Sequence, residues 1–159
     1  MRVNDDSEPK MRAMRLLEKD DATPTMYISD IARLFECTVS SAAERKGMSR
    51  GYRKILFHLA HKDGVTQLEL VKLSHLTAPT VSVALSKMES DGLVKREADK
   101  NDMRQIRVYL TEKGRAHDDF IRRVSRETEE QILKGLTDDD ITELNRMLRV
   151  MLENMVGKE

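Results

Sequence analysis

Residues 65–111 constrain the fold most, because they contain two short helix signatures in close succession. Thr66 is followed three residues later by Glu69, the capping-box pattern that begins a helix. After a turn at residues 74–76, Thr77 can cap a second helix, and Pro79 falls in its first turn, where a missing N–H costs no hydrogen bond. These signals predict two helices joined by a tight turn.

Two strand-like segments, residues 93–97 and 105–110, follow these helices. The second alternates regularly and places Ile106, Val108 and Leu110 on one face. The segment between the strands is polar and cannot form a core. The whole stretch therefore predicts a mainly α protein with a small β-wing, a winged helix-turn-helix with further helices on either side.

The second helix has two different faces. Spacings of three and four residues predict a buried face made of Val81, Ala84, Leu85 and Met88. The opposite face is small, hydroxylated or basic and contains no acidic residue: Thr80, Ser82, Val83, Ser86 and Lys87. Hydroxyls and a lysine can contact bases or phosphates, and Pro79 and Val83 can contact thymine methyl groups. This face fits a DNA major groove, although a solvated helix face has the same character.

The wing tip carries a second set of candidate DNA contacts. Lys100 and Arg104 suit phosphates or the negative potential of a narrow minor groove. Asp102, two residues before Arg104, is placed to pair with its guanidinium and hold it in one orientation.

Three motifs together resemble the MarR family of transcription regulators: Gly92-Leu93-Val94-Lys95-Arg96, Asp102-x-Arg104 and Leu110-Thr111-Glu112-Lys113-Gly114. The resemblance covers about residues 26–156. It implies a winged-helix homodimer on double-stranded DNA, built through the first and the last two helices, and most simply a repressor. It also implies that Arg104 is the wing arginine and that the recognition helix contacts DNA. The expected DNA-binding residues are Thr77, Pro79, Thr80, Ser82, Val83, Ser86, Lys87, Lys100, Asp102 and Arg104.

The distribution of charge agrees with a DNA-binding segment. The formal net charge of the chain is zero. Residues 50–115 hold 13 Lys or Arg and 8 Asp or Glu, a net +5, whereas residues 1–49 carry −1 and residues 116–159 carry −4. Positive charge is therefore concentrated in the predicted winged helix, although an excess of five can also arise by chance.

The predicted organisation has four parts. Residues 1–24 are expected to form a flexible N-terminal arm, 25–48 the first helix of the dimerisation region, 49–111 the DNA-binding domain and 112–159 the C-terminal dimerisation helices. The last helix has apolar residues in a nearly heptad pattern: Ile141, Leu144, Leu148, Met151, Leu152 and Met155. Such a stripe must be covered, and we expect a second copy to cover it; the alternative is packing within its own subunit.

The sequence offers little for catalysis or cofactors. It has no Gly-rich phosphate loop and no paired cysteines, and a cytoplasmic protein that is not an enzyme is expected, with no membrane span. The resemblance implies a pocket for a small aromatic or phenolic effector, with candidate residues Tyr52, Arg53, Phe57 and His58. Cys37 is a candidate redox sensor, and a metal site from Cys37, His58, His61 and His117 is disfavoured. The alternative functions are a winged-helix module for protein contact and a redox-sensing regulator based on Cys37.

Overall fold

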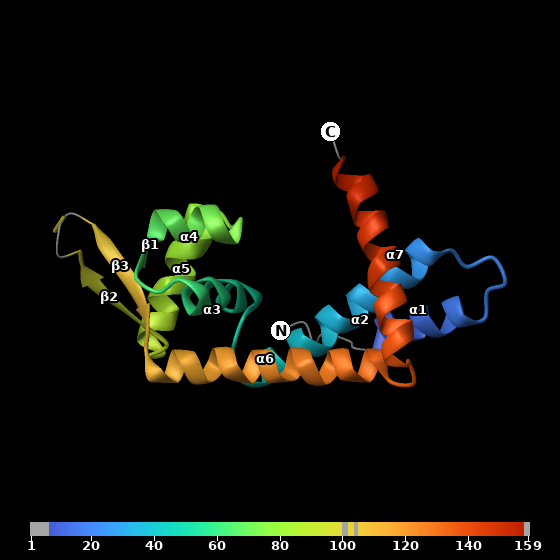
Figure 1. Ribbon diagram of the computed structural model, residues 1–159. Helices are drawn as coiled ribbons and strands as arrows, with labels where there is room; N and C mark the ends of the chain where they lie inside the picture. The colour runs from blue at the N-terminus through green and yellow to red at the C-terminus, as the bar shows by residue number, and fades with distance from the viewer. Residues whose placement is uncertain (1–6, 100–101, 104, 158–159) are drawn as a thin grey trace.

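The computed structural model describes residues 7–99, 102, 103 and 105–157. Its elements follow the order α1 (Ser7–Leu17), α2 (Pro24–Arg45), α3 (Arg50–His61), β1 (Val65–Thr66), α4 (Gln67–Ser74), α5 (Ala78–Ser90), β2 (Val94–Ala98), β3 (Ile106–Leu110), α6 (Glu112–Leu133) and α7 (Asp138–Val156). Elements α3 to β3 form a winged lobe at one end of the molecule, and α1, α2 and α7 lie toward the other end (Figure 1). The predicted fold class, mainly α with a small β-wing, is confirmed.

The helix starts lie where the sequence places them. The Thr66 hydroxyl accepts from Glu69 N at 3.2 Å, and the Glu69 carboxylate accepts from Thr66 N at 2.7 Å, which completes the predicted capping box. Thr77 caps α5 through a hydrogen bond from Thr80 N at 3.4 Å. These caps satisfy N–H groups that the first turn of a helix leaves without partners.

The sheet contains a strand that the sequence pattern did not indicate. Val65 and Thr66 pair antiparallel with β3, so that the strand order is β1-β3-β2. This two-residue strand is too short to show alternation. In β3, Val108 and Leu110 are buried as predicted, whereas Ile106 is 48% exposed. Ile106 pairs with Ala98 at the outer end of the ribbon, beyond the core.

One apolar core holds the winged lobe together. It joins the buried face of α5 to α3, α4 and the sheet, and its largest fully buried side chains include Ile55, Leu59, Leu70, Leu85 and Met88. All four side chains predicted for the inner face of α5 are buried. The orientation of α5 is thereby fixed, and its other face is directed to solvent.

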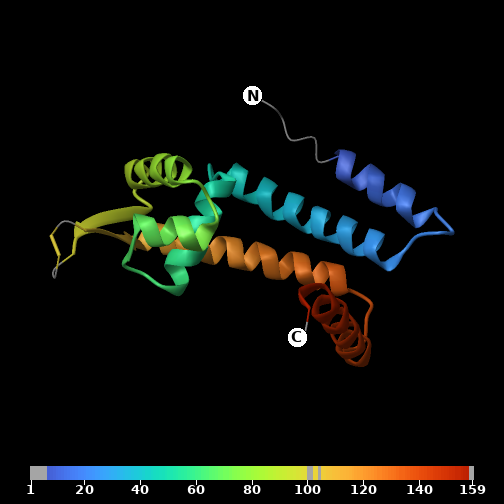
Figure 2. The ribbon, with the colours of Figure 1, turned by 90° about the horizontal axis from the view of Figure 1, so that it is seen from above.

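Helices α2 and α6, each of 22 residues, lie side by side and connect the lobe to the remaining helices (Figure 2). Seen from above, α1 lies against the outer side of α2, and α7 lies beyond α6 at the opposite edge. Residues 7–17, within the segment expected to be a flexible arm, instead form α1. Leu16 of α1 is buried, and Arg12 forms an ion pair with the buried Asp30 of α2 at 3.1 Å.

Helix α7 leaves much of its apolar stripe uncovered. None of its residues is buried, and Leu152 and Met155 are 64% and 85% exposed. The alternative that this stripe packs inside its own subunit is therefore wrong for the described chain. Among the described residues, no helix combines the length and the apolar character needed to cross a membrane.

Candidate nucleic-acid interface

The outer face of α5 presents the predicted recognition residues to solvent. Thr77, Pro79, Thr80, Val83, Ser86 and Lys87 are exposed, and Ser82 is half-buried. Val83 is 71% exposed, although it is an aliphatic side chain on a helix with a well-packed inner face. An exposed methyl surface between hydroxyl groups is the chemistry that contacts thymine in a major groove.

Not every polar group on this face is free to bind. Thr77 and Thr80 hydroxyls lie 2.8 Å apart, and the Thr77 oxygen also caps the helix. Lys87 Nζ lies 3.9 Å from Asp91 Oδ2 at the end of α5, a pair between exposed groups that contributes little stability. Lys87 can therefore exchange Asp91 for a phosphate at small cost.

Arg96 on β2 is a further basic residue at this surface that the sequence analysis did not single out. Its guanidinium donates to Ser86 Oγ at 3.2 Å, and its Nε lies 3.3 Å from Glu89 Oε2. The first strand of the wing is thus joined to the exposed face of α5. Arg96 belongs to the motif at residues 92–96, but only the fold shows that it reaches the recognition helix.

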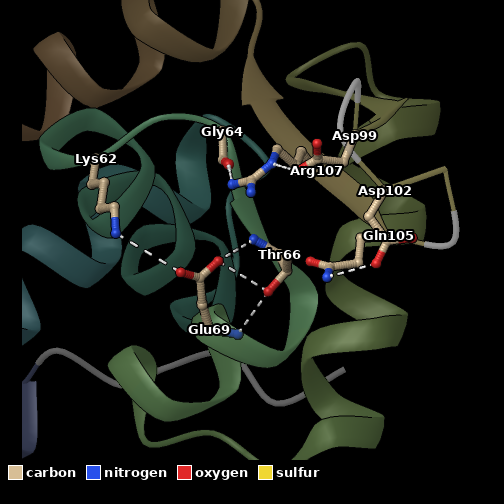
Figure 3. A network of polar contacts seen from close by, with 8 residues as sticks. All are labelled: Lys62, Gly64, Thr66, Glu69, Asp99, Asp102, Gln105 and Arg107. Carbon is tan, nitrogen blue, oxygen red and sulfur yellow. Dashed lines mark hydrogen bonds and ion pairs between the residues drawn. The ribbon is translucent and has the colours of Figure 1, made fainter.

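The wing is held at its base by a network of polar contacts (Figure 3). Arg107 on β3 forms an ion pair with the buried Asp99 and donates to Gly64 O at 2.7 Å. The pKa of Arg107 is raised, chiefly by its hydrogen bond to Asp99, so this contact keeps its charge throughout the physiological range. Asp99 N also donates to Gln105 O at 2.9 Å, which closes the ribbon below its tip.

The remaining wing predictions can be placed only in part. Asp102 is exposed and accepts from Gln105 Nε2 at 3.1 Å. Lys100 and Arg104 lie outside the described residues, so the predicted pairing of Asp102 with Arg104 and the phosphate contacts of the tip stay predictions.

Three of the four effector candidates come together, and Tyr52 does not join them. Arg53, Phe57 and His58 line a hollow of about 500 Å³ between α2, α3, α4 and α6, and the first two also line an adjoining hollow of about 400 Å³. Tyr52 is 4% exposed in the core, and its hydroxyl donates to Asp91 at 3.4 Å. Burial, followed by the charge of Asp91, raises the pKa of Tyr52.

Arg53, which lines this hollow, has one nitrogen without a partner in the described part of the chain. The Arg53 guanidinium binds Glu36 and lies 3.1 Å from Ser40 Oγ, but its buried Nε has no hydrogen-bond partner among the described residues. The pKa of His58 is lowered, first by burial and then by the charges of His61, His75 and Lys54. Burial beside the Phe57 ring thus disfavours the charged form of His58.

Cys37 is half-buried in α2 as a free thiol. Within the described part of the chain, no three His, Cys, Asp or Glu residues are grouped to hold a metal ion. The set that the sequence disfavoured as a metal site, Cys37, His58, His61 and His117, is not grouped in that way.

The fold and this surface together define a winged helix-turn-helix protein. Residues 46–105 match the model of the MarR family. The transcriptional repressor IacR of Pseudomonas putida is 34% identical over 76 residues, which are 48% of this chain and 46% of that repressor. The chain therefore spans about half the length of this curated relative.

Solved structures extend the likeness to most of the chain. A MarR transcriptional regulator from Methanosarcina mazei is 28% identical, with a TM-score of 0.65 over 82% of this chain and 94% of the other. A mutant of Staphylococcus aureus MepR bound to an oligodeoxyribonucleotide is 24% identical, with a TM-score of 0.67 over 84% of this chain and 98% of the other. The second comparison shows a shared fold.

Proposed function

We propose that this protein is a homodimeric regulator of transcription that binds a pseudo-palindromic site in double-stranded DNA. The observation that carries the proposal is the outer face of α5, which is exposed and has no acidic residue at its five predicted contact positions. Four buried residues on the inner side of the helix fix the orientation of this face. The simplest action of such a dimer is to occlude a promoter and thereby repress transcription. IacR is named a repressor and the compared MepR structure contains DNA, which supports the same chemistry here.

The dimer is supported by where apolar surface is exposed. Among the described residues, fourteen of the twenty exposed large apolar side chains lie on α1, α2, α6, α7 or the turn before α7: Met11, Met14, Leu17, Tyr27, Ile28, Ile31, Ile132, Leu136, Met147, Leu148, Val150, Leu152, Met155 and Val156. Apolar surface gathered in this way is typical of a subunit interface. A two-fold dimer through these helices would carry two recognition helices to neighbouring turns of one DNA duplex.

An aromatic carboxylate is the effector class that the hollow beside Arg53 fits. Phe57 and Ile121 supply an apolar wall, and Arg53, which also lines the hollow, supplies a guanidinium that can bind a carboxylate. Because the hollow lies between the lobe and the long helices, a ligand there would favour one lobe orientation over another and so alter DNA affinity. Thermal stabilisation by benzoate or salicylate, reduced in Phe57→Ala, is the expected result.

The first experiment is selection from a randomised duplex pool, followed by fluorescence anisotropy on the enriched sequence. We expect an inverted repeat with half-sites about one helical turn apart and a log affinity that falls linearly with log salt. Arg104→Ala and Lys87→Ala should weaken binding about tenfold or more and reduce the salt slope, since each removes a phosphate contact.

Arg123→Ala is the matched control. Arg123 is an exposed arginine on α6, where its side chain lies over the Phe120 ring, and its loss should leave DNA affinity unchanged. If folded, dimeric protein enriches no motif and shows no salt dependence, the DNA proposal fails and the winged lobe is a protein-contact module.

A further inference from the structure

Arg96 lies on the side of the wing that faces α5. It pairs directly across the ribbon with Val108, and cross-strand partners share one face of a sheet. Val108 is buried in the core that includes the inner face of α5, so Arg96 is directed to the same side. Its neighbours in the sequence, Lys95 and Glu97, lie on the opposite face of the ribbon and form an ion pair at 2.7 Å. Of these two basic residues, only Arg96 is therefore directed to α5.

Two contacts hold the Arg96 guanidinium against α5. Its Nη2 donates to Ser86 Oγ at 3.2 Å, and its Nε lies 3.3 Å from Glu89 Oε2. Ser86 and Glu89 are three residues apart, so they are neighbours on the surface of the helix. A planar guanidinium with its donors in a fixed fork can span two such groups in one orientation. Arg96 therefore holds Ser86 in place and offsets the charge of Glu89, which would otherwise repel phosphates.

The contact with Arg96 also determines where the Ser86 hydroxyl can direct its proton. A guanidinium only donates, whereas a hydroxyl has one proton and two lone pairs, so Ser86 Oγ must accept from Arg96 and direct its proton elsewhere. In other helices, Ser74 and Thr128 donate their protons to the carbonyl four residues earlier, at 2.6 Å and 2.7 Å. The Ser86 hydroxyl donates to no acceptor within the described ranges of the chain. Its proton is available to an acceptor on a bound molecule.

The major groove offers two kinds of group at the base edges. Guanine O6 and thymine O4 are acceptors, whereas the exocyclic amino groups of cytosine and adenine are donors. A hydroxyl that already accepts from Arg96 can donate to the first kind with no loss. To bind an amino group, Ser86 would use its second lone pair and leave its proton without a partner at a desolvated interface, which costs free energy.

We propose that Arg96 is a positioning residue for sequence recognition, because it makes Ser86 a hydrogen-bond donor that favours a keto base over an amino base. The keto bases are guanine and thymine, and the amino bases are adenine and cytosine. The inference rests on the DNA binding proposed above and deepens it by assigning a base preference to one contact. Without Arg96, the Ser86 hydroxyl can accept as readily as it donates, and the preference is lost.

Competition binding on the enriched DNA sequence tests this inference. Each position of one half-site is changed to all four bases, and the affinities of wild type, Ser86→Ala and Arg96→Met are measured by fluorescence anisotropy. We expect one position at which wild type prefers guanine or thymine about fivefold, the ratio that one hydrogen bond of ordinary strength gives. At that position, both variants should bind all four bases within about twofold of one another.

Two controls separate positioning from an effect of charge. Lys95→Met removes the same charge from the opposite face of β2 and should retain the base preference. The double variant Arg96→Met, Glu89→Gln removes one positive and one negative charge, so the net charge of the lobe is unchanged. It should lose the base preference and keep the wild-type slope of log affinity against log salt. A slope reduced by about one would show that Arg96 itself binds a phosphate, and the positioning role would be overturned.

The remaining outcomes distinguish this inference from the proposed function. Ser86 is an exposed helical position at which alanine is favourable, so Ser86→Ala should fold, and circular dichroism verifies folding of Arg96→Met. An equal loss of affinity for every base in Ser86→Ala, or a wild-type preference for adenine or cytosine at the position that it affects, would overturn the inference while DNA binding stands. Retention of the preference in Arg96→Met alone would overturn the role of Arg96. Folded wild-type protein that enriches no motif would remove the proposed DNA binding and this inference with it.

Discussion

Arg107 and Asp99 form an ion pair that joins the second strand of the wing to the end of the first, and Arg107 extends it to Gly64 O. Asp99 is buried, and this guanidinium compensates part of its charge. We expect Asp99→Asn to lower the free energy of unfolding by roughly 1.5 kcal/mol, the low end for a charged hydrogen bond, since Arg107 remains partly solvated.

The same change should weaken DNA binding more than it weakens the fold, because the wing loses its fixed angle to α5. Chemical denaturation and anisotropy measure the two effects separately. Arg107→Lys is the informative companion, since lysine keeps the charge but cannot bind Asp99 and Gly64 O together. Wild-type DNA affinity in both variants would show that the wing is not positioned by this pair.

Gly114→Ala should destabilise the protein by about 2 kcal/mol or more, through overpacking against backbone. A Cβ at position 114 would lie 2.1 Å from Leu93 O, an atom that cannot rotate away. Thermal unfolding measures the effect. Gly51→Ala is the control, because its Cβ would meet nothing closer than 3.8 Å, and a similar loss of stability in both variants would contradict the proposed clash.

Thr77→Ala should cost about 1 kcal/mol by removing the N-cap of α5, whereas Thr77→Ser should retain most of the stability. The hydroxyl accepts from Thr80 N and lies 2.8 Å from the Thr80 hydroxyl. Urea denaturation of the two variants provides the measurement. If serine and alanine are equally destabilising, the threonine methyl group and not the cap is responsible.

Stability should fall as pH drops below about 6.5. Burial is the main cause that lowers the pKa of both His58 and His117. The charges of His61, His75 and Lys54 lower the pKa of His58 further. The charges of Lys113 and Lys46 do the same for His117. Below the ordinary value of 6.5, the unfolded chain binds protons that the folded chain does not, so unfolding becomes easier.

Melting temperatures between pH 7.5 and 5.5 should therefore decline, and the double variant His58→Gln, His117→Gln should decline less steeply. An identical decline in the double variant would assign the effect to other groups.

Local signals in the sequence predicted the helix starts well, because each depends on residues three positions apart. Thr66 and Thr77 cap helices as expected. The motif at residues 110–114 also acquires a physical meaning: the Thr111 hydroxyl donates to Gly92 O at 2.6 Å and accepts from Gly114 N at 3.0 Å. One threonine thus joins the end of α5, the wing and the start of α6.

Features that depend on distant residues could not be predicted in this way. The strand at Val65 depends on its pairing with Val108. Helix α1 is held to α2 by the ion pair between Arg12 and Asp30, and the burial of Asp30 is not evident from the sequence pattern of α2. The positive charge of Arg96 is evident from the sequence. Its contact with Ser86 is not, because it depends on how the wing packs against α5. Tyr52 does not lie with the other three effector candidates, because its side chain is directed into the core toward Asp91.

Helix α6 is continuous over 22 residues from the wing to the turn before α7, and this continuity makes it a lever. At about 1.5 Å per residue its length is about 33 Å, so a tilt of about 10° at one end displaces the other by about 6 Å. Successive base pairs are separated by about 3.4 Å, so this displacement approaches two steps along the duplex. A tilt of about 10° among the terminal helices would thus be enough to take a recognition helix out of register with its DNA.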